Sequence, residues 1–259
     1  MKRILITGAN SYIGTSFERY MAQWPDQYRV DTVDMVGGGW REMDFSCYDC
    51  IYHVAGIAHQ KETEENAHLY YEVNRDLAVE TAGKAKHDGV KQFIFLSTMA
   101  VYGMDEGAIS MDTQPNPVTH YGKAKWEAEQ QMQTLRDGNF SVAILRPPIV
   151  YGDGCKGNYQ SLIKIAKKLP VFPDYRNKRS MIDIRRLCWY VKDLIDRGYD
   201  GLVLPQDEDY VCTCQMIRQI GESMGRRIHL WKILNPAVGL AKRFTTAGRK
   251  ACGDLYYEK

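Results

Sequence analysis

Residues 7–14 read Thr7-Gly8-Ala9-Asn10-Ser11-Tyr12-Ile13-Gly14. They follow a short apolar run at residues 3–7 and precede a helical pattern that extends to about residue 22. A turn of this kind binds pyrophosphate, because backbone N–H groups at a helix N-terminus point at the anion and small residues let it approach. The spacing is Gly-x-x-x-x-x-Gly, with Ser11 midway, instead of Gly-x-Gly-x-x-Gly. We predict a dinucleotide-binding turn; an ordinary glycine-rich turn between a strand and a helix is the alternative.

Strand and helix patterns alternate over the first 150 residues. Helical patterns precede or follow most of the predicted strands, and in residues 66–87 Leu69, Val73 and Leu77 recur every four residues on one face. Residues 35–43 hold three glycines and leave little room for a helix between the second and third strands. The strands are predicted at residues 3–7, 28–33, 50–54, 92–97 and 141–146, and the helices after Gly14 to about residue 22 and at residues 66–87 and 121–135. This alternation predicts an α/β fold, a Rossmann-type doubly wound parallel sheet.

The pattern loosens near residue 150, after Pro147 and Pro148. Beyond it, residues 158–168 and 213–224 are helical in pattern and residues 201–204 extended. We therefore expect a dinucleotide-binding Rossmann domain at residues 1–150. A small, mixed substrate-binding region at residues 151–259 is expected to pack on it.

The composition is that of a globular protein. The chain has 259 residues, of which 44% are hydrophobic and 25% charged, and its net charge of +2 does not indicate a nucleic-acid partner. No apolar stretch approaches the roughly 18 residues of a membrane span, and the first residues resemble a strand more than a secretory signal. Seven cysteines in a chain of this size indicate reduced thiols. We expect a cytoplasmic protein with no membrane span.

Asp34 stands at the end of the second predicted strand, twenty residues after Gly14. A carboxylate there accepts hydrogen bonds from both adenosine ribose hydroxyls and repels a 2′-phosphate, which favours NAD over NADP. A solvated acid at a strand end is the alternative, and Arg41 nearby would weaken the discrimination.

Tyr121 and Lys125 lie four residues apart on one face of a predicted helix. An ammonium group favours the phenolate and so lowers the phenol pKa from about 10, which makes an acid/base usable near neutrality. The preceding predicted strand ends in Ser97 and Thr98, at the sheet edge where open α/β folds bind ligands. A surface pair is the alternative for Tyr121 and Lys125.

Taken together, these segments resemble the extended short-chain dehydrogenase/reductases, and within them the nucleotide-sugar epimerase/dehydratase branch. The resemblance covers about residues 1–230 and implies a Rossmann fold, an NAD cofactor (with NADP as the alternative) and a nucleotide-sugar substrate. It rests on seven segments in the family's order and approximate spacing: residues 7–14, 34, 53–56 (His-Val-Ala-Gly), 74 (Asn), 95–103 (Phe-Leu-Ser-Thr-Met-Ala-Val-Tyr-Gly), 121–125 and 146–152 (Arg-Pro-Pro-Ile-Val-Tyr-Gly).

The resemblance implies a role for individual residues. Tyr121 would be the general acid/base, Lys125 would hold the nicotinamide ribose and tune Tyr121, and Thr98 would bind the reacting oxygen. Asn158 and Arg179 would join Thr98 in binding substrate, Arg179 at the nucleotide diphosphate. For Arg179, one basic residue among several in a loop is the alternative. Besides Tyr121 and Lys125, the implied cofactor contacts are Gly8, Asn10, Ser11, Tyr12, Ile13, Gly14, Asp34, Asp44, Phe45, Ala55, Gly56 and Pro148.

Three departures from the family pattern bear on function. Ser11 replaces a central glycine. Met99 and Ala100 stand where 4,6-dehydratases of the family carry an Asp-Glu pair; they cannot transfer protons, so we do not expect a dehydratase. Arg185 and Arg186 replace an acidic pattern. They either face the sugar pocket and favour an acidic substrate, or lie on the outer face of a helix, which is the alternative that we favour.

Other chemistry-bearing residues are expected to be structural. We expect no metal site, because Cys50 of the pair Cys47/Cys50 begins a predicted strand and the pair Cys212/Cys214 lacks the two-residue spacer of zinc knuckles. His53 on a buried strand is expected to be packed. Residues 240–250 predict a basic amphipathic helix. Such a helix is solvated, packs in a homodimer or touches a membrane surface, and the first two alternatives are favoured.

The sequence therefore predicts an NAD(P)-dependent enzyme that acts at C4 of a nucleotide sugar by hydride transfer, as UDP-hexose 4-epimerases do. Two alternatives remain: a nucleotide 4-keto-sugar reductase, whose reacting geometry is the same, and a non-catalytic NAD-binding sensor. A homodimer is left open.

Overall fold

The computed structural model describes residues 1–58, 60–155 and 157–259. They form two compact units. The first consists of residues 1–103, 115–147 and 183–205, and the second of residues 104–114, 148–182 and 206–259. Compared with the expected division near residue 150, residues 183–205 join the first unit and residues 104–114 join the second.

The first unit contains a six-stranded sheet in which every strand pair is parallel. The strand order is β10-β6-β4-β3-β1-β2, so the order of the chain reverses between β1 and β3. The strands are β1 (Lys2–Thr7), β2 (Tyr28–Val33), β3 (Cys50–His53), β4 (Gln92–Leu96), β6 (Ser141–Leu145) and β10 (Gly201–Val203). All residues of β3 and β4 are buried, as expected of strands covered on both faces. The predicted α/β, doubly wound sheet is confirmed.

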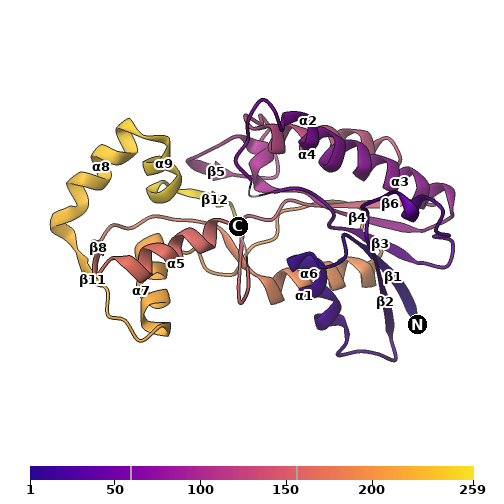
Figure 1. Ribbon diagram of the computed structural model, residues 1–259, viewed down its shortest axis with the longest axis horizontal. Helices are drawn as coiled ribbons and strands as arrows, with labels where there is room; N and C mark the ends of the chain where they lie inside the picture. The colour runs from indigo at the N-terminus through magenta and orange to yellow at the C-terminus, as the bar shows by residue number, and fades with distance from the viewer. Residues whose placement is uncertain (59, 156) are drawn as a thin grey trace. The chain divides into compact units, whose positions relative to one another are not determined.

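Helices cover both faces of this sheet (Figure 1). On one face lie α1 (Tyr12–Met21) and α6 (Ile184–Arg197); on the other lie α2 (Ala67–Tyr71), α3 (Leu77–His87) and α4 (His120–Gln133). The α6 helix buries apolar residues at spacings of three and four, among them Leu187, Val191 and Leu194. As predicted, no full helix joins β2 to β3; the connection holds only the 3₁₀ turn η1 (Gly39–Arg41).

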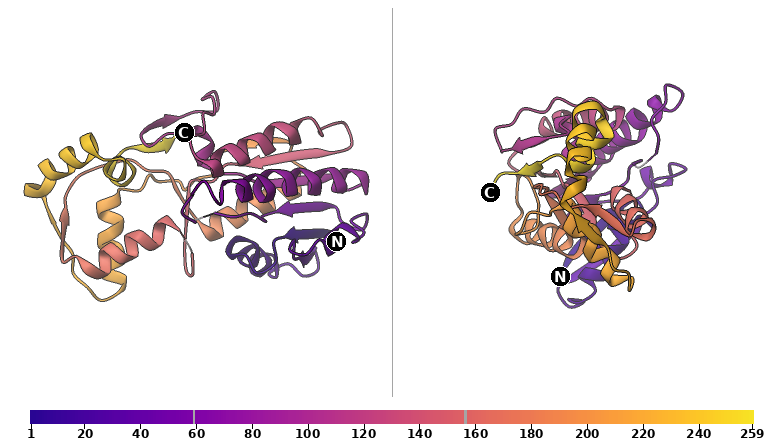
Figure 2. Two further views of the ribbon diagram at one scale, coloured as in Figure 1. Left: turned by 45° about the horizontal axis from the view of Figure 1, so that its top comes forward. Right: turned by 90° about the vertical axis from the view of Figure 1, so that its left-hand side faces the viewer.

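The segment from residue 67 to residue 87 differs from the prediction in the face that it buries. A π-helical turn, η2 (Glu72–Asp76), interrupts it between α2 and α3, and α3 runs beside α4 (Figure 2). The buried residues include Tyr70, Asn74 and Ala78, whereas Leu69 is 38% exposed. The prediction followed the large aliphatic residues, but the sheet-facing positions are filled by an aromatic ring and small residues that allow close helix packing.

The second unit is built from short elements. Its helices are α5 (Asn158–Lys168), α7 (Thr213–Ser223), α8 (Asn235–Phe244) and α9 (Thr246–Cys252). Three strand pairs join distant parts of the chain: β5 (Gly107–Ile109) with β12 (Leu255–Tyr257), β7 (Ile149–Tyr151) with β9 (Met181–Asp183), and β8 (Val171–Pro173) with β11 (His229–Trp231). Residues of α5 and α7 share a small apolar core with Met181 and Ile228. Within the described ranges, no helix has the length and apolarity to cross a membrane.

Candidate active site

The turn after β1 lies where the strand order reverses, which is where open α/β sheets bind ligands. Gly8 has a φ of 92°, and a Cβ atom on it would lie 2.9 Å from the backbone nitrogen of Ala55, just after β3. Glycine is therefore required at residue 8, because the turn must take a left-handed conformation and pass close to the neighbouring strand end. A Cβ atom on Gly14 would lie 2.7 Å from the Ser11 hydroxyl.

Ser11 begins α1 as its N-cap. Its hydroxyl oxygen accepts a hydrogen bond from the Gly14 N–H at 3.1 Å, so the departure from the family's glycine is accommodated by an ordinary capping interaction. Asn10 has a φ of 63°, which asparagine tolerates better than most residues. The amides of the first helical turn, that of Ile13 among them, have no carbonyl partner within the helix. Tyr12 opens this turn. The turn therefore fits a dinucleotide pyrophosphate.

Asp34 lies exposed directly after β2. Its Oδ1 accepts a hydrogen bond from the Val36 N–H at 2.9 Å, which fixes the carboxylate in a local turn. Arg41 is engaged elsewhere: its guanidinium donates to both carboxylate oxygens of Glu80 and lies 4.6 Å from the Trp40 ring. A loop that presents a carboxylate and holds the nearby guanidinium by an ion pair suits two ribose hydroxyls better than a phosphate.

Asp44 and Phe45 have different surroundings. Asp44 is exposed, and the backbone N–H and hydroxyl of Ser46 donate to its carboxylate, which lowers the pKa of Asp44. Phe45 is completely buried, and its N–H donates to Asp88 at 3.1 Å. The side chain of Phe45 therefore supports the fold, and the predicted adenine contact depends on Asp44.

Thr98, Tyr121 and Lys125 meet at the carboxyl end of β4. Thr98 follows this strand; its hydroxyl accepts a hydrogen bond from the Ala100 N–H at 3.1 Å, and its side chain lies close enough to Tyr121 to lower the pKa of that hydroxyl. Tyr121 and Lys125 lie on successive turns of α4, and the Lys125 ammonium donates to the Leu96 carbonyl at 2.9 Å. The Tyr121 ring packs edge-on against that of Tyr70. The structure thus brings the three predicted catalytic residues together.

Burial controls the protonation of two of these groups. It raises the pKa of Tyr121, against the opposing effect of the Thr98 side chain. It lowers the pKa of Lys125 to about 7, against the opposing charge of Glu129. The net shift of the Tyr121 pKa is therefore upward, opposite to the direction expected from Lys125, because desolvation by burial is its largest cause.

Gly56 connects the cofactor turn with these residues. A Cβ atom on Gly56 would lie 2.6 Å from the Asn74 side-chain oxygen and 3.5 Å from the Lys125 ammonium nitrogen. Asn74, completely buried in the π-helical turn, accepts from the Ile57 N–H and donates to the Ile57 carbonyl, both at 3.0 Å. Asn74 therefore fixes the exposed backbone of Gly56 beside Lys125.

Glu62 is a site residue that the sequence did not indicate. Its carboxylate accepts hydrogen bonds from the N–H groups of His120 and Tyr121, at 2.9 and 3.1 Å. The hydroxyl of Thr119 accepts from the Gly122 N–H as the N-cap of α4. A carboxylate at this position is favoured by the helix dipole and fixes the turn that carries Tyr121. Only the Thr119 cap leaves a signal in the sequence.

A buried ion pair underlies the same residues. Glu129 is completely buried, and Arg146 donates to it with Nε at 3.1 Å and Nη2 at 2.5 Å. Ser97 also donates to Glu129, and Arg146 donates to the Tyr102 hydroxyl at 2.8 Å. One signal was available: Glu129 follows Lys125 by four residues on the same face of α4, and a buried acid needs a partner.

Asn158, Arg179 and Pro148 belong to the second unit. Pro148 is buried. Arg179 pairs through its backbone with Val211, its guanidinium donates to the Gly253 carbonyl at 3.1 Å, and burial lowers its pKa. The side chain of Asn158 lies outside the described part of the structure. The roles of these three residues toward ligands stay predictions.

The remaining candidates are structural. His53 is completely buried, its Nδ1 lies 2.8 Å from the Thr7 hydroxyl, and burial lowers its pKa to about 3, which confirms it as a packed histidine. Cys47 is exposed, Cys50 is buried, and the described residues contain no group of three or more His, Cys, Asp or Glu able to hold a metal.

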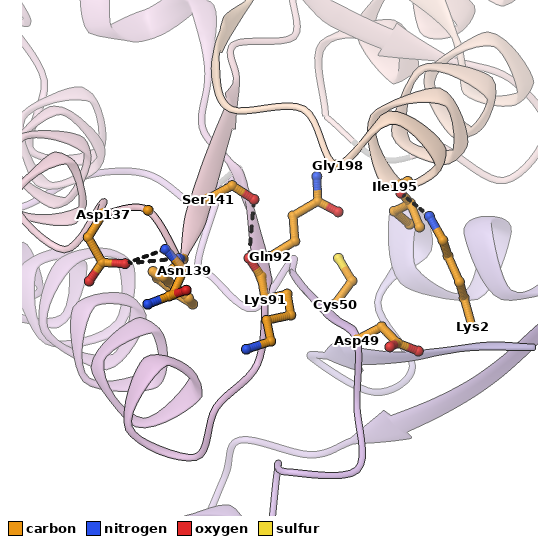
Figure 3. Close-up of a pocket in the computed structure, with 12 residues that line it drawn as sticks. Lys2, Asp49, Cys50, Lys91, Gln92, Asp137, Asn139, Ser141, Ile195 and Gly198 are labelled. Carbon is orange, nitrogen blue, oxygen red and sulfur yellow. Dashed lines mark hydrogen bonds between the residues drawn. The ribbon is translucent and has the colours of Figure 1, made fainter.

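A pocket lies at the opposite, amino edge of the sheet (Figure 3). Residues at the first ends of four strands line it: Lys2, Cys50, Gln92 and Ser141. Lys2 donates to the Ile195 carbonyl at 2.6 Å at the C-terminal end of α6. None of the predicted site residues lines this pocket, and the chemistry that they offer is at the carboxyl edge.

The chain is similar in sequence and in structure to known proteins. Residues 4–191 match the model of the NAD dependent epimerase/dehydratase family. A UDP-glucose 4-epimerase of Vibrio cholerae is 31% identical over 253 residues, which span 87% of this chain and 76% of that protein. An N-acetyl-alpha-D-glucosaminyl-diphospho-ditrans,octacis-undecaprenol 4-epimerase of Escherichia coli O157:H7 is 26% identical, over 62% of this chain and 50% of that protein. The structure of UDP-glucuronic acid 4-epimerase from Bacillus cereus in complex with NAD superposes with a TM-score of 0.72 at 20% identity, covering 96% of this chain and 94% of that one.

Proposed function

The chain belongs to the NAD dependent epimerase/dehydratase family, and from this premise we propose that it is a 4-epimerase of sugars carried on a diphosphate, with UDP-hexoses as the first candidates. Its cofactor is a nicotinamide dinucleotide. The observation that carries the proposal is the meeting of Thr98, Tyr121 and Lys125 at the sheet edge that also holds the Gly8 turn.

Each of the three residues has a distinct task in this proposal. The Tyr121 phenolate accepts the proton of the sugar C4 hydroxyl as the hydride leaves C4, and the resulting phenol later returns that proton to the same oxygen. Thr98, beside Tyr121, holds the reacting oxygen in line with it. Lys125, beside the Gly56 backbone, binds the ribose next to the nicotinamide. When bound, NAD would supply the acceptor for a hydride from C4 of the sugar and the donor that returns it to the opposite face of the same carbon.

The substrate class follows from the two relatives. One is named for UDP-glucose and the other for a sugar on undecaprenyl diphosphate, so a sugar linked to a diphosphate is the chemistry that they share. We assign the grip on that diphosphate to Arg179. Met99 and Ala100 carry no proton-transferring group, so the proposed reaction at C4 does not continue to loss of water.

A turnover assay without added NADH tests the proposal. An epimerase converts UDP-glucose, UDP-N-acetylglucosamine or their C4 epimers with catalytic NAD only, because the hydride is returned in each cycle. A 4-keto-sugar reductase consumes one NADH per product. NAD binding with no turnover on any of these sugars would contradict the proposal and favour a sensor.

Tyr121→Phe separates the proposed chemistry from binding. We expect turnover to fall about 10²–10⁴-fold, the usual contribution of a general acid/base, while NAD affinity stays nearly unchanged because the ring is kept. Tyr70→Phe is the matched control, since it removes the hydroxyl of the adjacent ring, which donates to the Gln60 carbonyl. Equal turnover in Tyr121→Phe and wild type would remove Tyr121 from the mechanism.

A further inference from the structure

The C-terminal part of the second unit has an unusual charge distribution. Residues 223–253 contain no Asp or Glu, while the rest of the chain has more acidic than basic side chains. Seven basic residues lie in this stretch: Arg226, Arg227, Lys232, Lys242, Arg243, Arg249 and Lys250. The stretch therefore carries a formal charge of +7 in a chain whose net charge is only +2.

The same stretch exposes large apolar side chains. Trp231, the last residue of β11, is 51% exposed, and Ile233, in the 3₁₀ turn between β11 and α8, is 81% exposed. Leu240 and Phe244 on α8 are 62% and 69% exposed. Leu240 and Phe244 are four residues apart and so lie on one face of the helix, and Val238 is the only residue of α8 that is buried among those described. We call Trp231, Ile233, Leu240 and Phe244, with the basic residues among them, the α8 surface.

Four of the seven basic residues fall into two groups. Lys242 and Lys250 face Glu106 and Asp105, at 2.9 and 3.8 Å, and so anchor the segment to the same unit. Among the described residues, Lys232 and Arg243 have no carboxylate within 4.0 Å. Their charges are therefore available to a partner.

We propose that the α8 surface docks on an anionic lipid bilayer. Helices that lie in the membrane interface combine Trp, Phe and Leu on one side with Lys and Arg beside them, so that apolar side chains enter the acyl boundary while the cations meet lipid phosphates. The stems of Lys232 and Arg243 are long enough to follow the apolar residues and still reach the head groups.

The charges argue against a second copy as the occupant. A two-fold contact places the same patch on both sides, so Lys232 and Arg243 of one copy would oppose those of the other, while the nearby acids Glu106 and Asp105 already face Lys242 and Lys250. Ile233 and Phe244, exposed among these cations, favour hydrocarbon over a purely polar partner. The inference does not depend on the proposed reaction.

Vesicle flotation tests the proposal with the full chain. We expect binding to phosphatidylglycerol/phosphatidylcholine vesicles at about 0.15 M salt, weakening as salt is raised, and little binding to phosphatidylcholine alone. Lys232→Gln/Arg243→Gln should weaken binding about 30-fold, at roughly fivefold per charge. Leu240→Ser/Phe244→Ser should weaken it roughly a hundredfold.

Matched variants in the same unit control for unspecific effects. Met111→Ser removes another large exposed apolar side chain, and Lys167→Gln/Lys168→Gln removes two exposed charges from α5; both should float as wild type does. Absence of flotation of the wild type with anionic vesicles would overturn the proposal. Flotation of both α8 variants equal to that of the wild type would overturn it too. A dimer in sedimentation that Leu240→Ser/Phe244→Ser converts to a monomer would reassign the surface to a second copy.

Discussion

The ends of β4 and β2 both carry candidate functional residues in the first unit, but their surroundings differ. Behind Thr98 at the end of β4, buried groups from four segments join through Glu129 and Arg146, whose side chains are 0% and 5% exposed. At the end of β2, Asp34 is exposed and bonds to the backbone two residues later. Its neighbour Arg41 is held by Glu80 at the surface, where both side chains are about half exposed.

The difference indicates where each function can change. At the β4 end, replacing one side chain of the buried pair leaves the other charge in the interior without a partner. The geometry of the site and the stability of the fold therefore depend on the same residues. At the β2 end, contacts are local or solvated, so charge can be altered with little effect on the fold. We expect the reacting groups to be fixed by the protein as a whole and cofactor preference to depend on few exposed residues.

The largest effect is expected from breaking the buried pair. Glu129→Gln or Arg146→Met should lower the free energy of unfolding by about 3–5 kcal/mol, because the remaining partner stays buried without compensation. The double variant Glu129→Gln/Arg146→Met should recover part of this loss. Urea unfolding at pH 7, with the dependence on denaturant fitted for each variant, measures both effects.

The control is an exposed ion pair of the same unit. Arg136 and Asp200 lie 2.6 Å apart, with both side chains 38% exposed, so Arg136→Gln should change stability by no more than about 1 kcal/mol. If Glu129→Gln lowers the free energy of unfolding by no more than Arg136→Gln does, the buried pair at the β4 end is no more important for stability than an exposed pair.

Lys125 provides a pH test of the same buried region. Burial lowers its pKa from 10.5 to about 7. Between these values the unfolded chain binds a proton that the folded protein does not, so stability rises with pH by about 1.4 kcal/mol per unit. Lys125→Met removes this contribution. The free energy of unfolding of the wild type should therefore rise relative to that of the variant as pH rises from 7 to 9.

Urea unfolding of both proteins across this range measures the difference. Lys123→Met, which removes an exposed lysine from the same helix, should give a difference from wild type that does not vary with pH. Parallel pH profiles of wild type and Lys125→Met would mean that Lys125 keeps an ordinary pKa.

The sheet was predictable because its strands are continuous apolar runs, as in β4, and its turns have glycines at fixed points. The second unit was less predictable from the sequence. Its strands β5 and β12 have three residues each, and their pairing joins residues 107–109 to residues 255–257. Nothing local encodes such a pairing. The π-helical turn at residues 72–76 likewise contains no glycine or proline from which it could have been predicted.

For the site, the sequence indicated candidate residues but not their surroundings. Tyr121 and Lys125 follow from helical spacing, and Ser11 from its place before a helix. Glu62 approaches α4 from nearly sixty residues away, and the depth at which Lys125 lies depends on the packing of several elements. The direction of the Tyr121 pKa shift was missed for that reason: burial is a tertiary property.

Asp34→Ala tests the exposed end. Removing the carboxylate should narrow the preference for NADH over NADPH about tenfold, or about 1.4 kcal/mol, because a 2′-phosphate is no longer repelled. Stability should change by less than about 0.5 kcal/mol, as for surface substitutions in general. Adding Glu80→Gln, which releases Arg41, should move the preference further toward NADPH.

Equilibrium binding of both cofactors, followed by their fluorescence, measures this preference. Asp26→Ala is the control, since it removes another exposed carboxylate, in the turn before β2, and should leave both affinities unchanged. Tighter binding of NADPH than of NADH by the wild type would exclude Asp34 as the selecting residue.

The smallest effect is expected at Arg185 and Arg186, in the first turn of α6. The Arg185 side chain is 86% exposed, which confirms its predicted solvated position, and it contacts the cap Asp183 at 3.2 Å; Arg186 lies over the Tyr190 ring. Cations at a helix N-terminus are unfavourable by about 0.3–1 kcal/mol each, but the contact with Asp183 offsets part of this. Arg185→Asp/Arg186→Asn should therefore raise the melting temperature by no more than about 3 °C. The sugar preference should not change, because Arg185 points to solvent. A switch toward a different sugar in this variant would place the arginines in the substrate site instead.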